Sequence, residues 1–134
     1  MSNLNHKKLD GTDVVIQTIE SIDATLASSG AATVKRGTIL ARNTSTGNLG
    51  VYASNGTDGL NVPKYVLLNE VVFSGAGEAP VSAMSVGEVW KSRLIVQADG
   101  DDSNIGYAVL EALRPTIIAR LSDELGAFDN GSAS

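Results

Sequence analysis

The residues best able to do chemistry in this chain are few, and they do not form a catalytic set. The sequence has one histidine, His6, and no cysteine, which excludes histidine-based triads, thiolate nucleophiles and zinc sites built from these residues. Its serines lack a base to activate them. Asp101 and Asp102 are adjacent, and no spacing predicts a second carboxylate at catalytic separation. We therefore expect a protein that is not an enzyme, and keep a hydrolase using Asp101 or Asp102 only as a formal possibility.

The acidic loop Asp99–Asn104 resembles the start of a calcium-binding loop, because oxygen-bearing side chains stand at its first, third and fifth positions. Such a loop requires glycine at the sixth position and glutamate at the twelfth. This chain has Asn104 and Leu110 there. The pattern favours a loop that leads into a helix. Gly75–Gly77 lacks the rest of a phosphate-binding loop, so we expect neither a metal nor a cofactor.

Charge and hydropathy exclude two classes of partner. The formal net charge is −5 and aromatic residues make up 4% of the chain, so both phosphate-neutralising charge and a base-stacking platform are lacking. Residues 97–134 carry the whole imbalance, with two arginines against seven acids. No apolar run reaches the ~18 residues of a membrane span. We expect a protein made in the cytoplasm that contacts neither nucleic acid nor membrane.

Three aromatic residues raise an alternative function, that of a carbohydrate-binding β module on a virion or cell surface. Trp90, Tyr52 and Tyr65 could stack on sugars. Trp90 follows Val89 in an expected strand, where neighbouring side chains point to opposite faces. Burial of Trp90 in the core or in an interface is the interpretation we favour, and the low aromatic count also weighs against sugar binding.

Short apolar runs separated by turn residues predict a mainly β fold, a small antiparallel sheet or barrel. One short helix is expected after Asn104, capped by Ser103 and stopped by Pro115. The stretch Gly75–Pro80 reads as a loop. The strands are expected at Gly37–Arg42, Leu49–Ala53, Val62–Phe73, Val81–Val86, Val89–Val96 and Thr116–Leu121. The first two should form a hairpin through a turn at Ser45–Asn48, and Gly87 should separate the fourth from the fifth.

The segment Asp13–Ala27 is ambiguous between helix and strand. Val15, Ile19, Ile22 and Leu26 have helical spacing, but many of its residues are β-branched, which favours an extended segment. As an apolar arm without a place in its own fold, it would need the sheet edge of another polypeptide. We therefore expect three regions: a flexible N-terminal arm (1–30), a β-rich domain (31–121) and a polar acidic tail (122–134).

Five short motifs, taken in order, resemble the head decoration proteins of lambda-like tailed bacteriophages. They cover most of the chain, and their order is more specific than any one of them. Pro115 and the acidic tail depart from the family pattern. The motifs are Val34–Arg42 (VKRGTILAR), Asn55–Gly59 (NGTDG), Val62-Pro63 followed by Val66–Leu68, Gly87–Val89 with Leu94, and Leu113-Arg114 before Ile117-Ile118.

The resemblance implies a structural cement protein of the virion. Family members form homotrimers at local threefold positions on the outside of the expanded head, where they bind the major capsid protein and stabilise the shell against the pressure of packaged DNA. Their N-terminal arms add a strand to the capsid. Trp90 is a candidate for the trimer interface, and the residues predicted to contact the capsid are Val14, Val15, Ile16, Gln17, Thr18 and Ile19.

Overall fold

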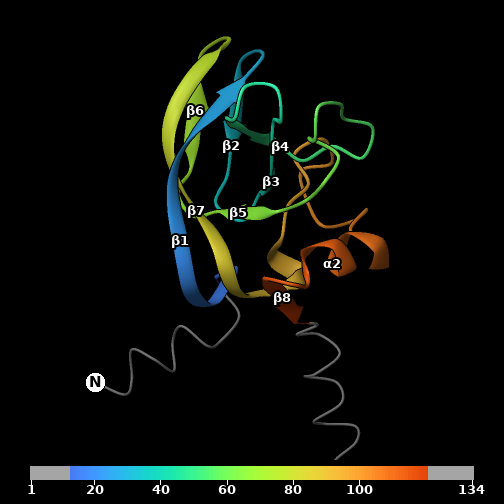
Figure 1. Cartoon of the computed structure of the whole chain (residues 1–134). Helices are drawn as coiled ribbons and strands as arrows, with labels where there is room; N and C mark the ends of the chain where they lie inside the picture. Colours follow the sequence, from blue (N-terminus) through green and yellow to red (C-terminus); the bar gives the residue numbers. More distant parts are fainter. Residues whose placement is uncertain (1–12, 121–134) are drawn as a thin grey trace, which may run out of the picture.

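A computed structural model describes residues 13–120 and shows a β-barrel with one helix beside it (Figure 1). The expected mainly β chain with one short helix near its C-terminal end is confirmed. His6 lies outside the described residues. The elements are β1 (Val15–Ser28), β2 (Ala32–Val34), β3 (Ile39–Arg42), β4 (Leu49–Val51), β5 (Tyr65–Leu67), β6 (Val71–Phe73), β7 (Gly77–Trp90), the 3-10 turn η1 (Lys91–Arg93), the helix α2 (Tyr107–Leu113) and β8 (Ile117–Arg120).

Five strands close into a ring. The hydrogen-bonded order is β1-β4-β3-β5-β7, and β7 pairs again with β1. The pair β3–β4 is antiparallel, which confirms the expected hairpin. Closure depends on a single parallel register between Leu26 of β1 and Leu49 of β4. Beyond the ring, β8 adds to β7 in parallel, while β2 and β6 form a separate two-stranded sheet.

The core consists of two clusters on opposite faces of β3 and β5. Neighbouring residues of a strand point to opposite faces, so Ile39 belongs to one cluster and Leu40 to the other. The first cluster includes Val89 of β7, Leu113 of α2 and Ile117 of β8, and it packs α2 against these two strands. The second includes Leu26 and lies between the upper parts of β1 and β7 and the β2–β6 sheet. Neither face of the central strands is left to solvent.

The segment expected to be an arm is a strand of the fold. Its extended conformation is confirmed, since β1 is a strand of 14 residues, and Figure 1 shows it beside β7. The premise that it has no partner in its own chain is wrong. β1 pairs antiparallel with β7 at twelve register positions, from Val15–Val89 to Ser28–Gly77. The backbone of this β-branched segment is therefore paired within its own chain, and part of its side-chain surface is buried there.

One long strand replaces two predicted ones. We expected a break at Gly87 and a second strand that continues to Val96, but β7 runs unbroken from Gly77 to Trp90 and η1 follows it. Gly87 marks a close approach: a Cβ there would collide with the carbonyl oxygen of Gln17 and come within 2.8 Å of the Met84 sulfur. The loop expected at Gly75–Pro80 is likewise mostly strand. Pro80 is tolerated because β5 does not reach this part of β7, which leaves one side without a strand neighbour.

Two further predictions need correction in detail. The long apolar run Val62–Phe73 divides into β5, in the barrel, and β6, in the small sheet. The helix begins one turn later than its expected cap: Gly106 is the N-cap and makes no side-chain cap bond. Ser103 instead donates its backbone N–H to the Asp101 carboxylate at 2.9 Å. The helix ends before Pro115, as predicted.

Candidate functional site: the open edge of strand β1

The outer edge of β1 is the longest unpaired strand edge in the part of the chain described. One edge of β1 is covered by β7 along its whole length. On the other edge, β4 pairs only at Leu26. From Val15 to Thr25 this edge therefore has no strand partner within residues 13–120. Its backbone N–H and C=O groups form a template onto which another strand can add.

The lower half of this edge, residues 15–21, is irregular and exposed. The register with β7 shifts between Val15 and Gln17, between Thr18 and Glu20, and between Glu20 and Ser21. Such bulges twist a strand and re-aim its side chains. From Gln17 to Ser21 every residue is exposed. Ile19 keeps 63% of its surface in solvent, so the edge combines unpaired backbone with an exposed aliphatic side chain.

The six residues predicted to contact a capsid differ in burial. Val14 is buried in the first core cluster and Val15 packs against it, so their side chains serve the fold. Ile16 is half-buried. Gln17, Thr18 and Ile19 are exposed and remain candidates for an outside partner. The capsid contact itself stays a prediction, and the exposed residues among the six lie on a strand edge of the domain.

An ion pair fixes the beginning of β1. Arg36 donates from Nε and Nη2 to the two carboxylate oxygens of Asp13, each at 3.0 Å, and Asp13 also accepts the backbone N–H of Val14 at 2.7 Å. The hydrogen bond from Arg36 is the largest influence on the carboxyl group and lowers the pKa of Asp13 below its usual value of 3.8. This clamp holds the start of the strand against the residues before β3.

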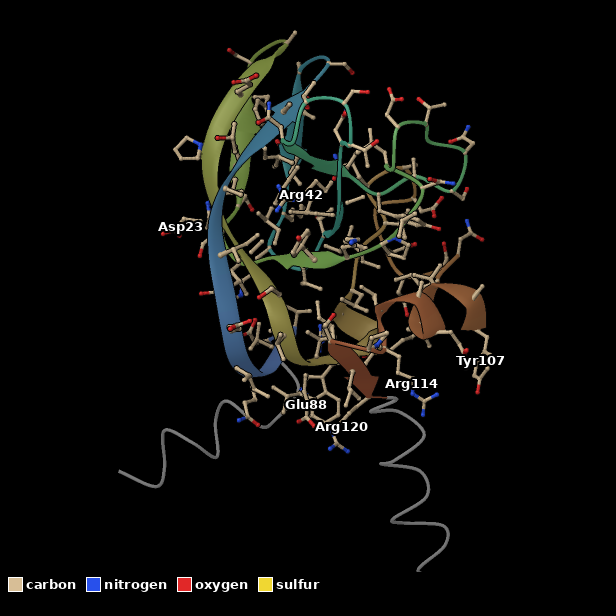
Figure 2. All side chains as sticks on the ribbon, viewed as in Figure 1. Asp23, Arg42, Glu88, Tyr107, Arg114 and Arg120 are labelled. Carbon is tan, nitrogen blue, oxygen red and sulfur yellow. The ribbon has the colours of Figure 1, made fainter. Side chains whose placement is uncertain are left out.

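Trp90 lies where the two ends of the described chain meet. Its backbone N–H donates to the Val14 carbonyl oxygen at 2.9 Å. Trp90 is the last residue of β7 and is in register with Arg120 of β8. Arg120 also binds Glu88 at 3.0 Å, and Figure 2 shows both side chains at this end of the molecule. The indole is half-buried, and its Nε1 has no acceptor within residues 13–120. The role of Trp90 in a trimer interface stays a prediction.

The three aromatic residues considered for sugar binding are not equally exposed. Tyr52 is buried in the first core cluster. Tyr65 is half-buried, and the Arg42 guanidinium lies 5.5 Å from the centre of its ring. A stacking platform needs exposed ring faces, so the burial of Tyr52 removes one of the three rings from that function.

The acidic loop makes local contacts. Asp102 binds Lys91 at 3.0 Å, and hydrogen bonds from the side chain and backbone of Ser103 lower the pKa of Asp101. Residues 13–120 contain no group of three histidine, cysteine or acidic side chains that could hold a metal ion. No helix in the same range is long and apolar enough to cross a membrane.

Sequence reasoning missed three features of this end of the molecule. The Asp13–Arg36 clamp and the Glu88–Arg120 pair join residues 23 and 32 positions apart, and no local pattern reports such pairs. The sequence predicts Tyr107 in a helix and Ile118 in a strand, but it does not predict that both side chains are exposed. The helical spacing of Tyr107 with Leu110 and Arg114 was a signal that α2 has a second, partly apolar side.

One comparison with known proteins identifies the family of this chain. The family model described as bacteriophage lambda head decoration protein D matches residues 17–114, nearly three quarters of the chain. The match includes most of β1, the barrel and α2. No curated protein and no solved structure gives a significant match. The chain therefore belongs to the bacteriophage lambda head decoration protein D family.

Proposed function

We propose that this protein is a structural cement protein that binds the outside of the expanded phage head as a homotrimer at local threefold positions. There it contacts the major capsid protein and stabilises the shell against the pressure of packaged DNA. The family match over residues 17–114 carries this proposal. The open edge of β1, which the match includes from Gln17 onwards, supports it with a surface suited to a second polypeptide.

The capsid contact is assigned to the exposed lower half of β1. An added capsid strand would satisfy the unpaired backbone groups there, and Ile19 would lose its contact with water. Glu20 and Asp23 are exposed on the same strand. Charges on an edge strand discourage pairing with identical edges, so the edge is suited to a partner of different sequence and poorly suited to self-association.

A trimer is the arrangement that makes such a small contact effective. A strand of a few residues buries far less than the ~1,000 Å² expected of a stable interface. Once one subunit of a trimer is bound, the second and third edges bind at a high effective concentration. Three weak contacts placed on three neighbouring capsid subunits then hold those subunits together.

The same proposal makes the protein a structural component of the virion surface and not an enzyme. The acidic residues considered for catalysis form local bonds, Asp102 to Lys91 and Asp101 to Ser103. Their side chains have a structural explanation in the loop between η1 and α2. The protein acts by binding, and its binding partner is the assembled shell.

The test is sedimentation with and without emptied, expanded capsids. The protein alone should sediment with three times the chain mass of 13.9 kDa, and it should pellet with expanded capsids. Unexpanded shells serve as the control, because the local threefold sites are expected to form on expansion. A protein that stays in the supernatant with expanded capsids would contradict the proposed function.

A further inference from the structure

A groove between α2 and β8 has no role in the capsid contact proposed above. We propose that it is the docking site for the segment that follows β8, residues 121–134 of the same chain. The inference does not depend on capsid binding, because it concerns two parts of one polypeptide.

The groove has a volume of about 240 Å³. Its helical wall consists of residues at positions i, i+3, i+4 and i+7, which form one side of α2. Its other wall is β8, whose outer edge has no strand partner within the described range. The lining residues are Tyr107, Leu110, Glu111, Arg114, Ile118 and Ala119.

The apolar part of this groove is unusually exposed. Tyr107 keeps 75% of its surface in solvent and Ile118 keeps 47%. Figure 2 shows Tyr107 projecting from α2 away from the barrel. The opposite side of the helix packs on the core, where Leu113 is buried. Exposed apolar residues gathered at one groove indicate a binding surface for an apolar segment.

The position of the groove identifies its occupant. Ile118 and Ala119 line it, and Arg120 is the last residue of β8, so the next segment starts where the groove is. That segment carries Leu121, Leu125 and Phe128. Their spacings of four and three residues are those of one helix face, and they match a groove whose lining is mostly apolar.

The direct connection to β8 favours a contact within one chain. The segment also contains Asp123, Glu124 and Asp129, but Arg114 on the groove already pairs with Glu111 at 3.6 Å, so charge adds little to the contact. A groove of this size supplies little binding energy to a free partner. A segment attached directly to β8 has a high effective concentration at the groove, so a weak contact suffices.

The test uses the full chain, which has no cysteine and therefore accepts a single spin label. Ala108 is exposed on α2 beside the groove without lining it. With a nitroxide on A108C, the amide signals of Leu125 and Phe128 should be lost in the ¹⁵N spectrum and return when the label is reduced. A label on A76C, in the turn before β7 at the other end of the molecule in Figure 1, should leave them unchanged.

Two further samples decide whether the contact is the one proposed. Phe128→Ser in the A108C background should restore the signals of the segment, because the apolar anchor is removed. Refolding ¹⁵N spin-labelled chains with an excess of unlabelled chains should leave the loss unchanged. Signals of Leu125 and Phe128 that persist beside the oxidised label would overturn the proposal. A loss that becomes weaker when unlabelled chains are added in excess would also overturn it, because the segment would then occupy the groove of a neighbouring copy.

Discussion

The two halves of β1 have similar residues and different roles. In the upper half, Ile22–Ser28 pairs with β7 without a register shift and closes the barrel through Leu26 and Leu49. In the lower half, all three register shifts fall between Val15 and Ser21. Leu26 is fully buried, whereas Ile19 is 63% exposed. One strand thus contributes a barrel wall at one end and an open edge at the other.

The comparison teaches that a strand's second edge decides its role. Both halves pair with β7, so pairing alone does not distinguish them. The upper half also pairs with β4 at Leu26. Its apolar side chains belong to the second core cluster, which includes residues of β2 and β6. Among residues 13–120 the lower half has no such second strand, so its unpaired backbone groups form an edge to which another chain can add.

The largest effect should come from the upper half. Leu26→Ala removes a fully buried side chain at the point of barrel closure, and we expect a loss of about 2–5 kcal/mol in the free energy of unfolding. Ile19→Ala, on the same strand, should change it by less than ~0.5 kcal/mol. Chemical denaturation of both variants measures the difference. Equal losses would show that the two halves carry similar packing.

The next effect tests the close approach within the lower half. Gly87→Ala places a methyl group against the Gln17 carbonyl oxygen and the Met84 sulfur, and we expect a destabilisation of about 1–3 kcal/mol. Gly77→Ala is the matched control in the same strand, because nothing lies within 4 Å of its Cβ position. Thermal unfolding of the two variants compares them. If Gly87→Ala proves as stable as Gly77→Ala, the proximity of β1 and β7 is not a constraint.

Binding should be affected by the lower half and not by the rest of the surface. Ile19→Asp puts a charge where the capsid strand is expected, and burying that charge should weaken capsid binding by at least about tenfold, or ~1.4 kcal/mol. Val72→Asp is the control, because Val72 is 69% exposed on β6. Co-sedimentation with expanded capsids measures both. Equal binding by the two variants would remove Ile19 from the contact.

The smallest effect concerns the clamp at the start of β1. Because the pKa of Asp13 is lower in the folded chain than its usual 3.8, its stabilisation is present above that value and is lost as pH falls through the folded pKa. The pair is about 40% exposed and screened by water, so Asp13→Asn should cost less than ~1 kcal/mol at pH 7.

The pH dependence supplies the check on that variant. The unfolding free energies of wild type and Asp13→Asn should converge as pH falls below about 3.8. Glu111→Gln is the control, because its pair with Arg114 is longer, at 3.6 Å, and more exposed. A difference between wild type and Asp13→Asn that stays constant down to low pH would mean that the clamp does not act through the charge of Asp13.

Much of the fold follows from local patterns in the sequence. β-branched density identified β1 as extended, turn residues identified the β3–β4 hairpin, and Pro115 marked the helix end. Gly87 was misread because glycine often ends a strand. Here it allows two backbones to approach, which depends on Gln17, 70 positions earlier in the chain. Such long-range contacts leave no local signal.

The candidate site was only half predictable for the same reason. The apolar character of residues 14–19 drew attention to the segment, but Val14 and Ile19 look alike in sequence. Only the pairing with β7 and the position of the first core cluster separate the buried Val14 from the exposed Ile19. The register shifts in the lower half likewise depend on the pairing of two strands that are far apart in the sequence.

Hydrogen exchange of the protein, free and bound to expanded capsids, tests the central claim most directly. If the lower half of β1 is the edge to which a capsid strand adds, peptides that cover Gln17–Ser21 should exchange much more slowly in the bound state. Peptides that cover Val71–Phe73 of β6 should be unchanged. Slowed exchange at β6 or elsewhere, with Gln17–Ser21 exchanging as in the free protein, would contradict the account.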